Sequence, residues 1–591
     1  MFEAVGLHRR LLQRPLSGVL HALIFVSFFV LMTAIIDAFG SGLFPSFSLS
    51  RSFAGPAIGL LQDLFAVLML IGVAMAVYQR CVLRPPRFAG SNQTDAIVIY
   101  LLIGAIVASM LLQAAFAIRA GAPTRWRPVA GAVASLLAPL NVPAKGGEDF
   151  FYWAHVAAIL GFLVYIPGSK HRHMFLAAPN IYLRSLGPKG LSPPSLEAPT
   201  SSATGRATIF DRKQILDLLT CTECGRCQAV CPAYASGLPL SPKTLIMDLR
   251  DALNADGAAT AFPSGAIADE TMWACTTCRA CMEVCPIHIE HVPKLIDLRR
   301  AAIDEDRIPR GLQDALSNIS RSGNSMGRPA RMRARWTKEL PFSIKDAREH
   351  SVDVLWFVGD YASYDPRVQE TTRQVARLLE AAGIDFGILY DAERNAGNDV
   401  RRSGEEGLFG TLAQSNVEAI SGCSYKRIMT TDPHSLNALR NEYRSLGQSF
   451  DVMHHTTLLA RLVEAGNLRI EPGAGGRVTY HDPCYLGRYN GEFDAPRRLI
   501  SATGHSLVEM PRCRENSFCC GAGGGRIWTG DEGVVERPSE NRIKEALGLE
   551  GVSKFVVACP KDKVMYSAAA DALGVKEQLR VLDVVELIHS T

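Results

Sequence analysis

Residues 221–286 contain one cysteine pattern twice, and this repeat constrains the chain more than any other feature. The segments CTECGRCQAVCP and CTTCRACMEVCP both follow the spacing C-x2-C-x2-C-x3-C-P. Thiolates at that spacing bind a 4Fe–4S cluster, and the fourth cysteine of each run normally ligates the cluster of the other run. A zinc site would use two pairs of ligands, and a disulfide framework belongs to small secreted chains. We therefore expect two cubane clusters, one on Cys221, Cys224, Cys227 and Cys285 and one on Cys275, Cys278, Cys281 and Cys231.

Composition indicates a membrane domain at the N-terminal end of a multidomain chain. The 591 residues are enough for several domains. A formal net charge of +4 gives no sign of a basic surface for nucleic acid. Hydrophobic residues make up 48% of the chain and are concentrated in about the first 170 residues. Cysteine-ligated clusters also imply a reducing compartment for the soluble part.

Four apolar stretches in this N-terminal part are long enough, or nearly so, to cross a bilayer, which needs about 20 helical residues. A fifth segment, Val129–Leu140, is short and contains Pro139, so we expect a re-entrant or interfacial piece. Basic residues before the first span and after the second and fourth place both ends in the cytoplasm. This predicts a multi-pass inner-membrane protein whose iron–sulfur domains face the cytoplasm. The predicted spans are Leu16–Phe39, Ile58–Val82, Ala96–Ile118 and Phe151–Pro167.

Histidines near the ends of these spans are candidate haem ligands. A bis-histidine b haem needs two imidazoles at the same depth on facing helices. His155 and His173 differ by about 27 Å along a helix that rises 1.5 Å per residue, so only His171 or His173 matches the depth of His21. We expect one haem on His21 and His173. Helix–helix hydrogen bonds, a proton path or interfacial basic side chains are the alternative explanations.

The segment HVAAILGFLVYIPGSKHRH resembles the last helix of the cytochrome b subunit of respiratory nitrate reductases, and HALIFVSFFVL, from His21, is similar to its partner helix. This resemblance implies a four-helix transmembrane cytochrome b-like bundle over residues 1–175. The family has a further histidine ten residues after the position of His21, where this chain has Leu31. The resemblance therefore implies that the inner haem is kept, and that His155 serves a quinone or a proton.

Composition also separates the middle of the chain into three parts. Residues 176–205 are rich in Pro, Ser and Gly, which predicts a linker. The helical periodicity of PKTLIMDLRDAL and VPKLIDLRRAAIDED predicts an all-helical two-cluster ferredoxin-type domain over residues 206–310. Residues 311–350 are a connector that we expect to be solvated; a docking strip for an acidic partner or lipid head groups is the alternative. Its stretch GRPARMRARW carries the arginines in question, Arg328, Arg331, Arg333 and Arg335.

From Ser351 onward, short apolar runs alternate with amphipathic segments, as in VDVLWFVGD followed by VQETTRQVARLLEAAG. This alternation predicts a parallel α/β fold. The region divides into two matching halves, residues 351–475 and residues 476–591.

The second half carries cysteines at strand ends and in a glycine-rich loop. Cys484 ends one predicted strand, Cys519 and Cys520 begin CCGAGGG, and Cys559 ends a later strand. The pattern resembles the CCG domain of heterodisulfide reductase and glycolate oxidase iron–sulfur subunits, which gathers such cysteines around a non-cubane cluster. Asp562 stands where that family has the last cysteine of C-P-x-C. The resemblance implies a non-cubane 4Fe–4S cluster assisted by Asp562, or a linear 3Fe–4S cluster; a cluster-free fold with a relic cysteine pair is the alternative.

The first half has lost every one of these ligand positions, so we expect it to be structural, as a shell for partner docking. The replacing residues are Asp360, Arg394, Asn395, Asp432 and Ser435. The GAGGG run of the second half is only a weak match to a phosphate loop, because no Lys-Ser/Thr follows it.

Nearly the whole chain resembles the membrane-bound electron-transfer-flavoprotein:quinone oxidoreductases of the heterodisulfide-reductase-D-like family. This resemblance implies that electrons pass from reduced electron-transfer flavoprotein (ETF) through the clusters and a b haem to the quinone pool, with the chemistry carried by the cofactors. Two alternatives remain. One is a thiol–disulfide reductase of the heterodisulfide type, and the other is the membrane iron–sulfur subunit of a glycolate or glycerol-3-phosphate dehydrogenase. A redox sensor without quinone turnover has no support beyond the lost ligands.

Overall fold

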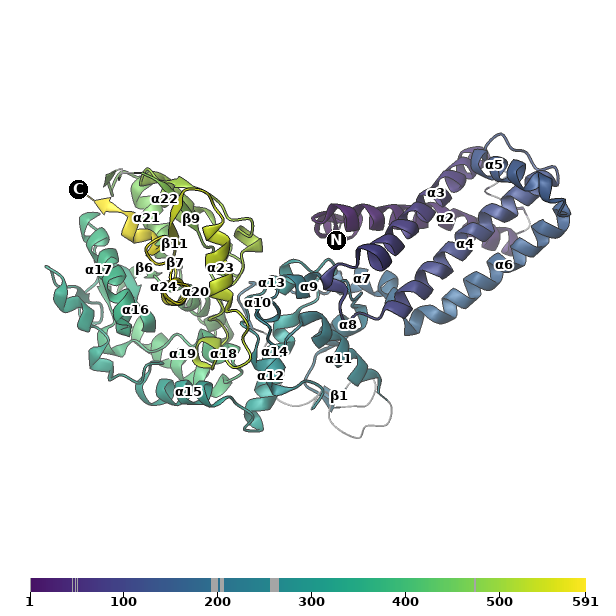
Figure 1. Cartoon of the computed structure of the whole chain (residues 1–591). Coiled ribbons are helices and arrows are strands. Elements are labelled where there is room, and N and C mark those ends of the chain that lie inside the picture. The colour runs from purple at the N-terminus through teal and green to yellow at the C-terminus, as the bar shows by residue number, and fades with distance from the viewer. Residues whose placement is uncertain are drawn as a thin grey trace. The chain divides into compact units, whose positions relative to one another are not determined.

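The chain forms two compact units in a computed structural model (Figure 1). The first comprises Met1–Leu183, Leu216–Gly225 and Cys285–Ile289, and the second comprises Arg184–Ile215, Arg226–Val284 and Glu290–Thr591. The ferredoxin-type segment is therefore divided between them. The structure describes all residues except 1, 45, 48, 50–51, 193–199, 202–206, 256–264, 472, 474 and 591.

Long apolar helices make up most of the first unit. Among the described residues, four helices are long and apolar enough to cross a membrane, which confirms the predicted number of spans. Helix α2 packs on α3, and α4 packs on α3 and α6. These helices are α2 (Pro15–Leu43), α3 (Gly55–Val77), α4 (Gln93–Arg119) and α6 (Ala144–Tyr165), the purple to blue helices of Figure 1.

The short fifth apolar segment forms helix α5 (Pro128–Leu137), followed by a 3₁₀ turn over Ala138–Leu140. Its first N–H groups have no partner within the helix, as at every helix N-terminus. The buried Asp63 of α3 is the acceptor for two of these groups: its carboxylate accepts hydrogen bonds from Val129 N at 2.5 Å and from Ala130 N at 3.1 Å. A negative charge at a helix N-terminus is also favourable for the helix dipole. Asp63 thus fixes α5 against α3.

The fourth spanning helix does not continue to His173, so the expectation of one helix from His155 to His173 is wrong. Helix α6 ends at Tyr165 and is followed by 3₁₀ turns over Ile166–Gly168 and Lys170–Arg172. Pro167 explains the break, because proline has no N–H to donate and its ring clashes with the preceding helical turn. A new helix, α7, then begins at His173 and ends at Tyr182. The calculated depth difference of about 27 Å therefore does not apply.

The segment that carries the two cysteine runs is helical between its loops, as predicted. Its cysteines lie at or beside short helices, and longer helices separate and follow the two runs. A two-residue antiparallel pairing of β1 (Thr200–Ser201) with β2 (Ala207–Thr208) precedes it. Its helices are α8 (Arg212–Thr220), α9 (Arg226–Ala229), α10 (Pro232–Ala235), α11 (Pro242–Asn254), α12 (Asp269–Trp273), α13 (Ala280–Glu283) and α14 (His291–Asp304).

Both C-terminal halves are parallel α/β folds, which confirms the predicted class. The first half has a five-stranded sheet in the order β3-β5-β4-β6-β7, and every pairing in it is parallel. Its strands are β3 (Lys345–Asp346), β4 (Val352–Phe357), β5 (Phe386–Ile388), β6 (Tyr425–Thr430) and β7 (Val452–His454). Its helices are α16 (Asp360–Tyr364), α17 (Pro366–Ala381), α18 (Asn398–Arg402), α19 (Glu406–Ser421), α20 (Pro433–Arg440) and α21 (His455–Glu464), preceded by α15 (Arg310–Ser322).

The second half repeats this plan with a four-stranded parallel sheet in the order β10-β9-β11-β12. A separate antiparallel pair joins β13 (His589–Ser590) to β8 (Ile470–Glu471). The strands are β9 (Arg477–Tyr480), β10 (Ser506–Leu507), β11 (Val552–Val557) and β12 (Arg580–Asp583), with helices α22 (Asp494–Ala502), α23 (Pro538–Leu547) and α24 (Pro560–Ala572). Because β9 and β11 are parallel neighbours, the loops after them, which carry Cys484 and Cys559, meet at one edge of the sheet.

The connector is not uniformly solvated, and this expectation is wrong for Arg333. Its side chain is buried and donates to Asp360 Oδ1 at 2.9 Å and to Glu393 Oε1 at 2.7 Å. The one cation pairs with both carboxylates, which offsets part of the cost of burying the three groups. Arg328, Arg331 and Arg335 of the same stretch are exposed, as expected.

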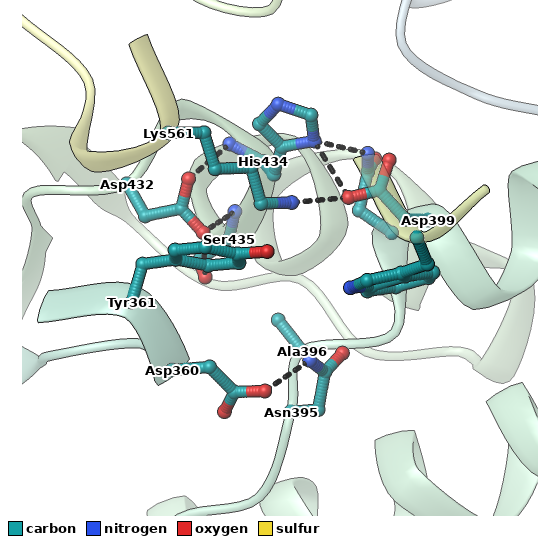
Figure 2. Close-up of a pocket in the computed structure, with 11 residues that line it drawn as sticks. Asp360, Tyr361, Asn395, Ala396, Asp399, Asp432, His434, Ser435 and Lys561 are labelled. Atoms are coloured by element: carbon teal, nitrogen blue, oxygen red, sulfur yellow. Dashed lines mark hydrogen bonds and ion pairs between the residues drawn. The ribbon is translucent and has the colours of Figure 1, made fainter. Parts of the chain in front are cut away.

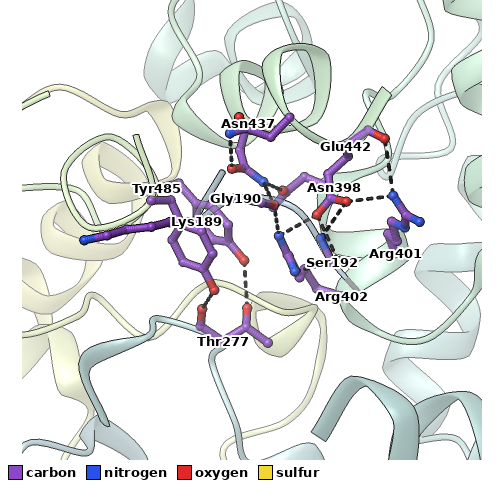
Figure 3. Close-up of polar contacts among 12 residues, drawn as sticks. Lys189, Gly190, Ser192, Thr277, Asn398, Arg401, Arg402, Asn437, Glu442 and Tyr485 are labelled. Carbon is purple, nitrogen blue, oxygen red and sulfur yellow. Dashed lines mark hydrogen bonds and ion pairs between the residues drawn. The ribbon is translucent and has the colours of Figure 1, made fainter. Parts of the chain in front are cut away.

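Part of the predicted linker is also a packed segment. Gly190 and Ser192 lie among the helices of the first half (Figure 3). Gly190 O accepts hydrogen bonds from Arg402 and from Asn437 Nδ2, and Ser192 N donates to Glu442 Oε2 at 3.0 Å. A Cβ at Gly190 would lie 1.9 Å from Asn437 Oδ1, so only glycine allows this approach. Residues 193–199 and 202–205 of the linker lie outside the described residues.

Candidate iron–sulfur centres

Four cysteines of the second CCG half are buried: Cys484, Cys519, Cys520 and Cys559. The thiols of Cys278, Cys484 and Cys520 are within hydrogen-bonding distance of Cys519 Sγ, and they hold the pKa of Cys519 well below its usual value. Burial raises the pKa of the fourth thiol, that of Cys559. Cys278 belongs to the second cysteine run, so the structure brings the CCG cysteines into contact with a predicted cubane ligand.

Asp562 joins this group, as the sequence predicted for the position of the missing cysteine. Its carboxylate lies within hydrogen-bonding distance of Cys520, and burial raises its pKa to about 7. Asp562 Oδ2 accepts no hydrogen bond from the described part of the chain, although it is fully buried. A buried acceptor without a donor is costly, and a bound metal would remove that cost. The oxygen therefore fits a role beside a cluster.

The CCGAGGG loop packs directly against the loop that joins Cys275 to Cys278, and its glycines make this possible. A Cβ at Gly523 would lie 2.6 Å from Thr276 O, and a Cβ at Gly524 would lie 2.8 Å from Thr277 Cγ2. Gly524 also has φ +63°, a conformation that favours glycine. The glycine run thus allows backbone-to-backbone approach between two cysteine loops, a purpose that its sequence alone did not reveal.

Two fully buried arginines connect the same loops. Arg299 donates to Cys275 O at 2.7 Å and to Gly524 O at 3.1 Å, and Arg488 donates to Cys278 O at 2.7 Å and to Ser517 O at 2.5 Å. A buried guanidinium stabilises negative charge on nearby sulfur atoms. These two cations therefore suit a site that concentrates thiolates.

The second predicted cubane set, which takes Cys231 from the first run, has the environment of buried metal-ligating thiols. Burial raises the pKa of Cys231 to about 12 and also raises that of Cys275. Thr277 N donates a hydrogen bond to Cys275 Sγ at 3.3 Å. Such thiols ionise when a metal binds, and N–H groups directed at sulfur are one determinant of cluster potential.

Three cysteines of the first predicted cubane set, Cys221, Cys224 and Cys285, belong to the first unit, together with the membrane helices. Burial raises the pKa of Cys285 to about 11, and Cys285 Sγ accepts a hydrogen bond from Ile289 N at 3.4 Å. Arg87 donates to Cys224 O at 2.6 Å, and Arg10 donates to Cys285 O at 3.0 Å. The loops that present these cysteines are therefore held by residues of the membrane domain. Cys227, the fourth member of the set, belongs to the second unit.

Glu223, between two of these cysteines, anchors its loop to the ends of two membrane helices. It is buried with φ +55°, and its Oε2 accepts hydrogen bonds from Lys170 Nζ at 3.1 Å and Asn92 N at 2.9 Å. Lys170 Nζ also donates to Asn92 O at 2.6 Å. A buried carboxylate paired and hydrogen-bonded in this way is costly to disrupt.

The three groups fit iron–sulfur clusters by their donor chemistry: clustered buried thiols, N–H···S hydrogen bonds, buried arginines and the buried carboxylate of Asp562, whose Oδ2 lies 3.6 Å from His481 Nε2. Among the described residues, no three His, Cys, Asp or Glu side chains converge tightly enough for a single metal ion. In a multi-iron cluster, by contrast, the thiolates ligate different iron atoms. Iron–sulfur centres are therefore the cofactors that these groups suit.

Of the candidate haem histidines, His171 and His173 lie side by side, whereas His21 lies beside His8, which the sequence did not mark as a candidate. The ring of His21 lies against that of His8, with centroids 5.1 Å apart, and the rings of His171 and His173 are 5.3 Å apart. His173 Nδ1 is 2.9 Å from Lys170 O, and His155 Nδ1 is 2.9 Å from Ile106 O. Each ring can thus donate from Nδ1 and leave Nε2 for a metal or a substrate, the usual arrangement in histidine ligands. Burial lowers the pKa of His173 and lowers that of His171 to about 3, so both rings are neutral, as a metal ligand must be.

The replaced ligand positions of the first half surround a small polar cavity of about 20 Å³, close to the volume that holds one water molecule (Figure 2). Asn395 Nδ2 donates to Asp360 Oδ2 at 2.6 Å, and Ser435 Oγ donates to Asp432 Oδ2 at 2.8 Å. Arg394 does not line this cavity, and its guanidinium instead donates to Asp391 O at 2.5 Å.

Several residues of these sites were missed in the sequence. They lie next to cysteines or form charge pairs, but no spacing rule marks them. Glu223, within CTEC, and Lys561, directly after Cys-Pro, are charged residues inside ligand motifs, and that position is the one signal that could have marked them. The others are Arg87, Lys170, Arg299, Asp399 and Arg488.

Family models assign two of the regions. A 4Fe–4S dicluster domain matches residues 213–286, and a cysteine-rich domain, CCG, matches twice, at residues 354–440 and 478–564. Both matches agree with the predicted ferredoxin-type and tandem CCG regions. No solved structure matches the chain.

Curated relatives cover the whole chain. "Probable iron-sulfur-binding oxidoreductase FadF" of Bacillus subtilis is 34% identical over 98% of this chain and 89% of the relative. "EtfAB:quinone oxidoreductase" of Syntrophomonas wolfei is 31% identical over 98% and 88%. One subunit of the dihydromethanophenazine:CoB–CoM heterodisulfide reductase of Methanosarcina barkeri is 31% identical over 64% of this chain and 94% of the relative. The chain therefore belongs to the heterodisulfide-reductase-D-like family of iron–sulfur oxidoreductases that includes FadF and EtfAB:quinone oxidoreductase, and it is a membrane-associated iron–sulfur oxidoreductase.

Proposed function

We propose that this protein transfers electrons from a reduced electron-transfer flavoprotein to a membrane quinone, by way of its iron–sulfur centres and a b-type haem. The observation that carries the proposal is how the cysteines are divided. Those of the second predicted cubane set and of the CCG half share one unit, and Cys278 contacts Cys519 there. Three cysteines of the first predicted cubane set share the other unit with the membrane helices. This division supports a path that begins in the CCG half and ends among those helices.

The name of one relative supports the proposed donor and acceptor. The relative from Syntrophomonas wolfei is named an EtfAB:quinone oxidoreductase and aligns with 98% of this chain. The positive-inside pattern of the membrane helices supports cytoplasmic iron–sulfur domains, which is where a soluble flavoprotein would reach them. A second candidate, reduction of a heterodisulfide, is favoured by the likeness to the heterodisulfide reductase of Methanosarcina barkeri. The first CCG half has no cysteine at its ligand positions, however, so it offers no second non-cubane centre.

A single haem is the best account of the histidines. His173 lies at the start of α7 with Nδ1 directed at Lys170 O, which leaves Nε2 for iron. His21 on α2 is its proposed partner. His155 donates to Ile106 O from within the fourth span and also contacts Ser109 Oγ at 3.1 Å. We assign His155 to a quinone or a proton.

When bound, the clusters and the haem supply one-electron transfer, and the residues of the chain hold and tune them. Eight cysteines, Cys221 to Cys285, would hold the two cubanes, and Cys484, Cys519, Cys520 and Cys559 with Asp562 would hold the third centre. Arg299 and Arg488 place positive charge beside the thiolates. Such charge favours the more negative, reduced state and raises the reduction potential.

An anaerobic reduction experiment tests the proposal. Purified full-length protein in detergent is mixed with enzymatically reduced ETF while the haem b spectrum is followed, and a quinone analogue is then added. We expect haem reduction followed by reoxidation, and electron paramagnetic resonance (EPR) should detect a third iron–sulfur signal beside two cubanes. ETF that stays reduced beside an oxidised haem would refute the donor.

Two cysteine variants make this test specific. Cys519→Ser should remove the third EPR signal and stop ETF oxidation, because Cys519 is central to the thiol group. Cys513→Ser is the matched control, since Cys513 is partly exposed and has no ligand spacing. If Cys519→Ser and Cys513→Ser oxidise ETF equally fast, the CCG centre is a relic.

A further inference from the structure

The first CCG half, which has lost its own cysteines, contacts the cysteine loops of the second half through Asp399. This aspartate lies at the start of α18 and is 4% exposed (Figure 2). Its Oδ1 accepts a hydrogen bond from Gly524 N at 2.9 Å, and its Oδ2 pairs with Lys561 Nζ. Gly524 belongs to CCGAGGG and Lys561 follows Cys559-Pro560, so one carboxylate holds both loops.

His434, from the adjacent helix α20, completes this contact. His434 Nδ1 lies 3.0 Å from Asp399 Oδ2, and its ring packs on Tyr485, directly after Cys484, with centroids 4.3 Å apart. Asn398 Nδ2 lies 3.2 Å from the same His434 nitrogen. The first half thus reaches all three ligand loops of the second half.

The pair between Asp399 and Lys561 is an ion pair in the buried interior. Burial alone would raise the pKa of Asp399, but His434 and Lys561 hold it well below its usual value. Burial alone would lower the pKa of Lys561, but Asp399 and, next to it, Asp432 raise it. The Lys561 ammonium is in turn one of the charges that act on the Cys559 thiol.

The cavity itself leaves no room for another ligand, since its volume of about 20 Å³ holds one water molecule. The place of the lost cluster therefore contains a charge network. Its contacts point to the second half, where the thiols lie.

We propose that Asp399 is a positioning residue for the third iron–sulfur centre: it fixes the two cysteine loops and balances the Lys561 charge beside them, so that the first half sets the reduction potential of the second. The inference rests on the proposed function, which places a cluster at Cys484, Cys519, Cys520 and Cys559.

The two ends of the ion pair give opposite predictions. Asp399→Asn keeps an oxygen that can accept from Gly524 N–H. It leaves the Lys561 ammonium without its main counter-charge, although Asp432 is still beside it. The reduced state of the third centre should therefore become more stable relative to the oxidised state. Lys561→Gln instead leaves the Asp399 carboxylate without its counter-charge, so the oxidised state of the third centre should become more stable relative to the reduced state. We expect each variant to change the reduced-to-oxidised ratio of the third EPR signal about tenfold at fixed potential, in opposite directions. For a one-electron couple this corresponds to about 59 mV each way.

Asp360→Asn is the matched control, because Asp360 is a buried, ion-paired aspartate of the same half whose hydrogen bonds go to Arg333, Ser325 and Asn395. It should leave the potential of the third centre unchanged. The two cubane EPR signals of each full-length sample report that the protein has folded. If Asp399→Asn does not accumulate, the sign of the potential shift in Lys561→Gln still tests the inference.

Shifts of the same sign in both variants, or a potential in Asp399→Asn equal to that in Asp360→Asn, would overturn the inference. A wild-type protein without a third iron–sulfur signal would instead refute the proposed cluster, which is a different failure.

Discussion

The contact between the CCGAGGG loop and the loop of the second cysteine run can be tested by adding single methyl groups. A Cβ at Gly524 would lie 2.8 Å and 2.9 Å from the Thr277 side chain, and overpacking of this kind costs about 1–3 kcal/mol. Its φ of +63° adds about 1–2 kcal/mol for a residue with a Cβ. Gly524→Ala should therefore lower the stability of this region by about 2–5 kcal/mol.

Two other glycines separate these contributions. Gly533 has φ +73° and no atom within 4 Å of a built Cβ, so Gly533→Ala should cost only the backbone part, about 1–2 kcal/mol. Gly523 is not in the left-handed region, but its Cβ would lie 2.6 Å from Thr276 O. Gly523→Ala should therefore cost only the overpacking part, about 1–3 kcal/mol.

The assay is guanidinium-induced loss of iron–sulfur absorbance in the purified full-length protein. With a slope of about 4 kcal/mol per molar denaturant, the overpacking part lowers the midpoint by roughly 0.3–0.8 M. The midpoint of Gly524→Ala should then lie below that of Gly533→Ala by this amount. Equal midpoints for these two variants would refute the close approach of the two cysteine loops.

Three further predictions concern the haem, the connector and the linker. His173→Ala should abolish the b-type absorbance and His171→Ala should retain it, since His173 has the Nδ1 contact of a metal ligand; the reverse result would exchange the ligands. Arg333→Met should cost about 3–5 kcal/mol in denaturant unfolding, because it leaves two buried carboxylates unpaired, whereas Arg335→Met at an exposed site should change stability by about 0.5 kcal/mol or less. Gly190→Ala should expose the linker to limited proteolysis; an unchanged digestion pattern would contradict its packing.

Local patterns in the sequence were sufficient for the elements and for the ligand loops. Apolar length marked the four spanning helices, and alternating strands and helices marked two parallel sheets. The cysteines after β9 and β11 could be placed at one sheet edge because parallel neighbours end together. The position of Asp562 beside Cys520 followed from its place in the motif.

Contacts between distant segments could not be derived in the same way. The buried pairs of Arg333 with Asp360 and of Asp399 with Lys561 join residues 27 and 162 positions apart. Each partner alone has the composition of a solvated residue, since arginine, aspartate and lysine are rarely buried unless paired. The predicted fourth span already ended at Pro167, close to the observed end at Tyr165, and only the depth calculation extended one helix to His173.

The fold of the first unit has a consequence for how the protein matures. Backbone carbonyls of Cys224 and Cys285 are held by arginines of the membrane domain, and Glu223 is held at the ends of its helices. The loops that carry Cys224 and Cys285 of the first predicted cubane set are therefore held in place only once these helices have assembled. The cysteines grouped around Cys519 have no such requirement, because all belong to the second unit. We therefore expect that iron can be loaded first at the cysteines of the second unit and last at the loops that the membrane helices hold.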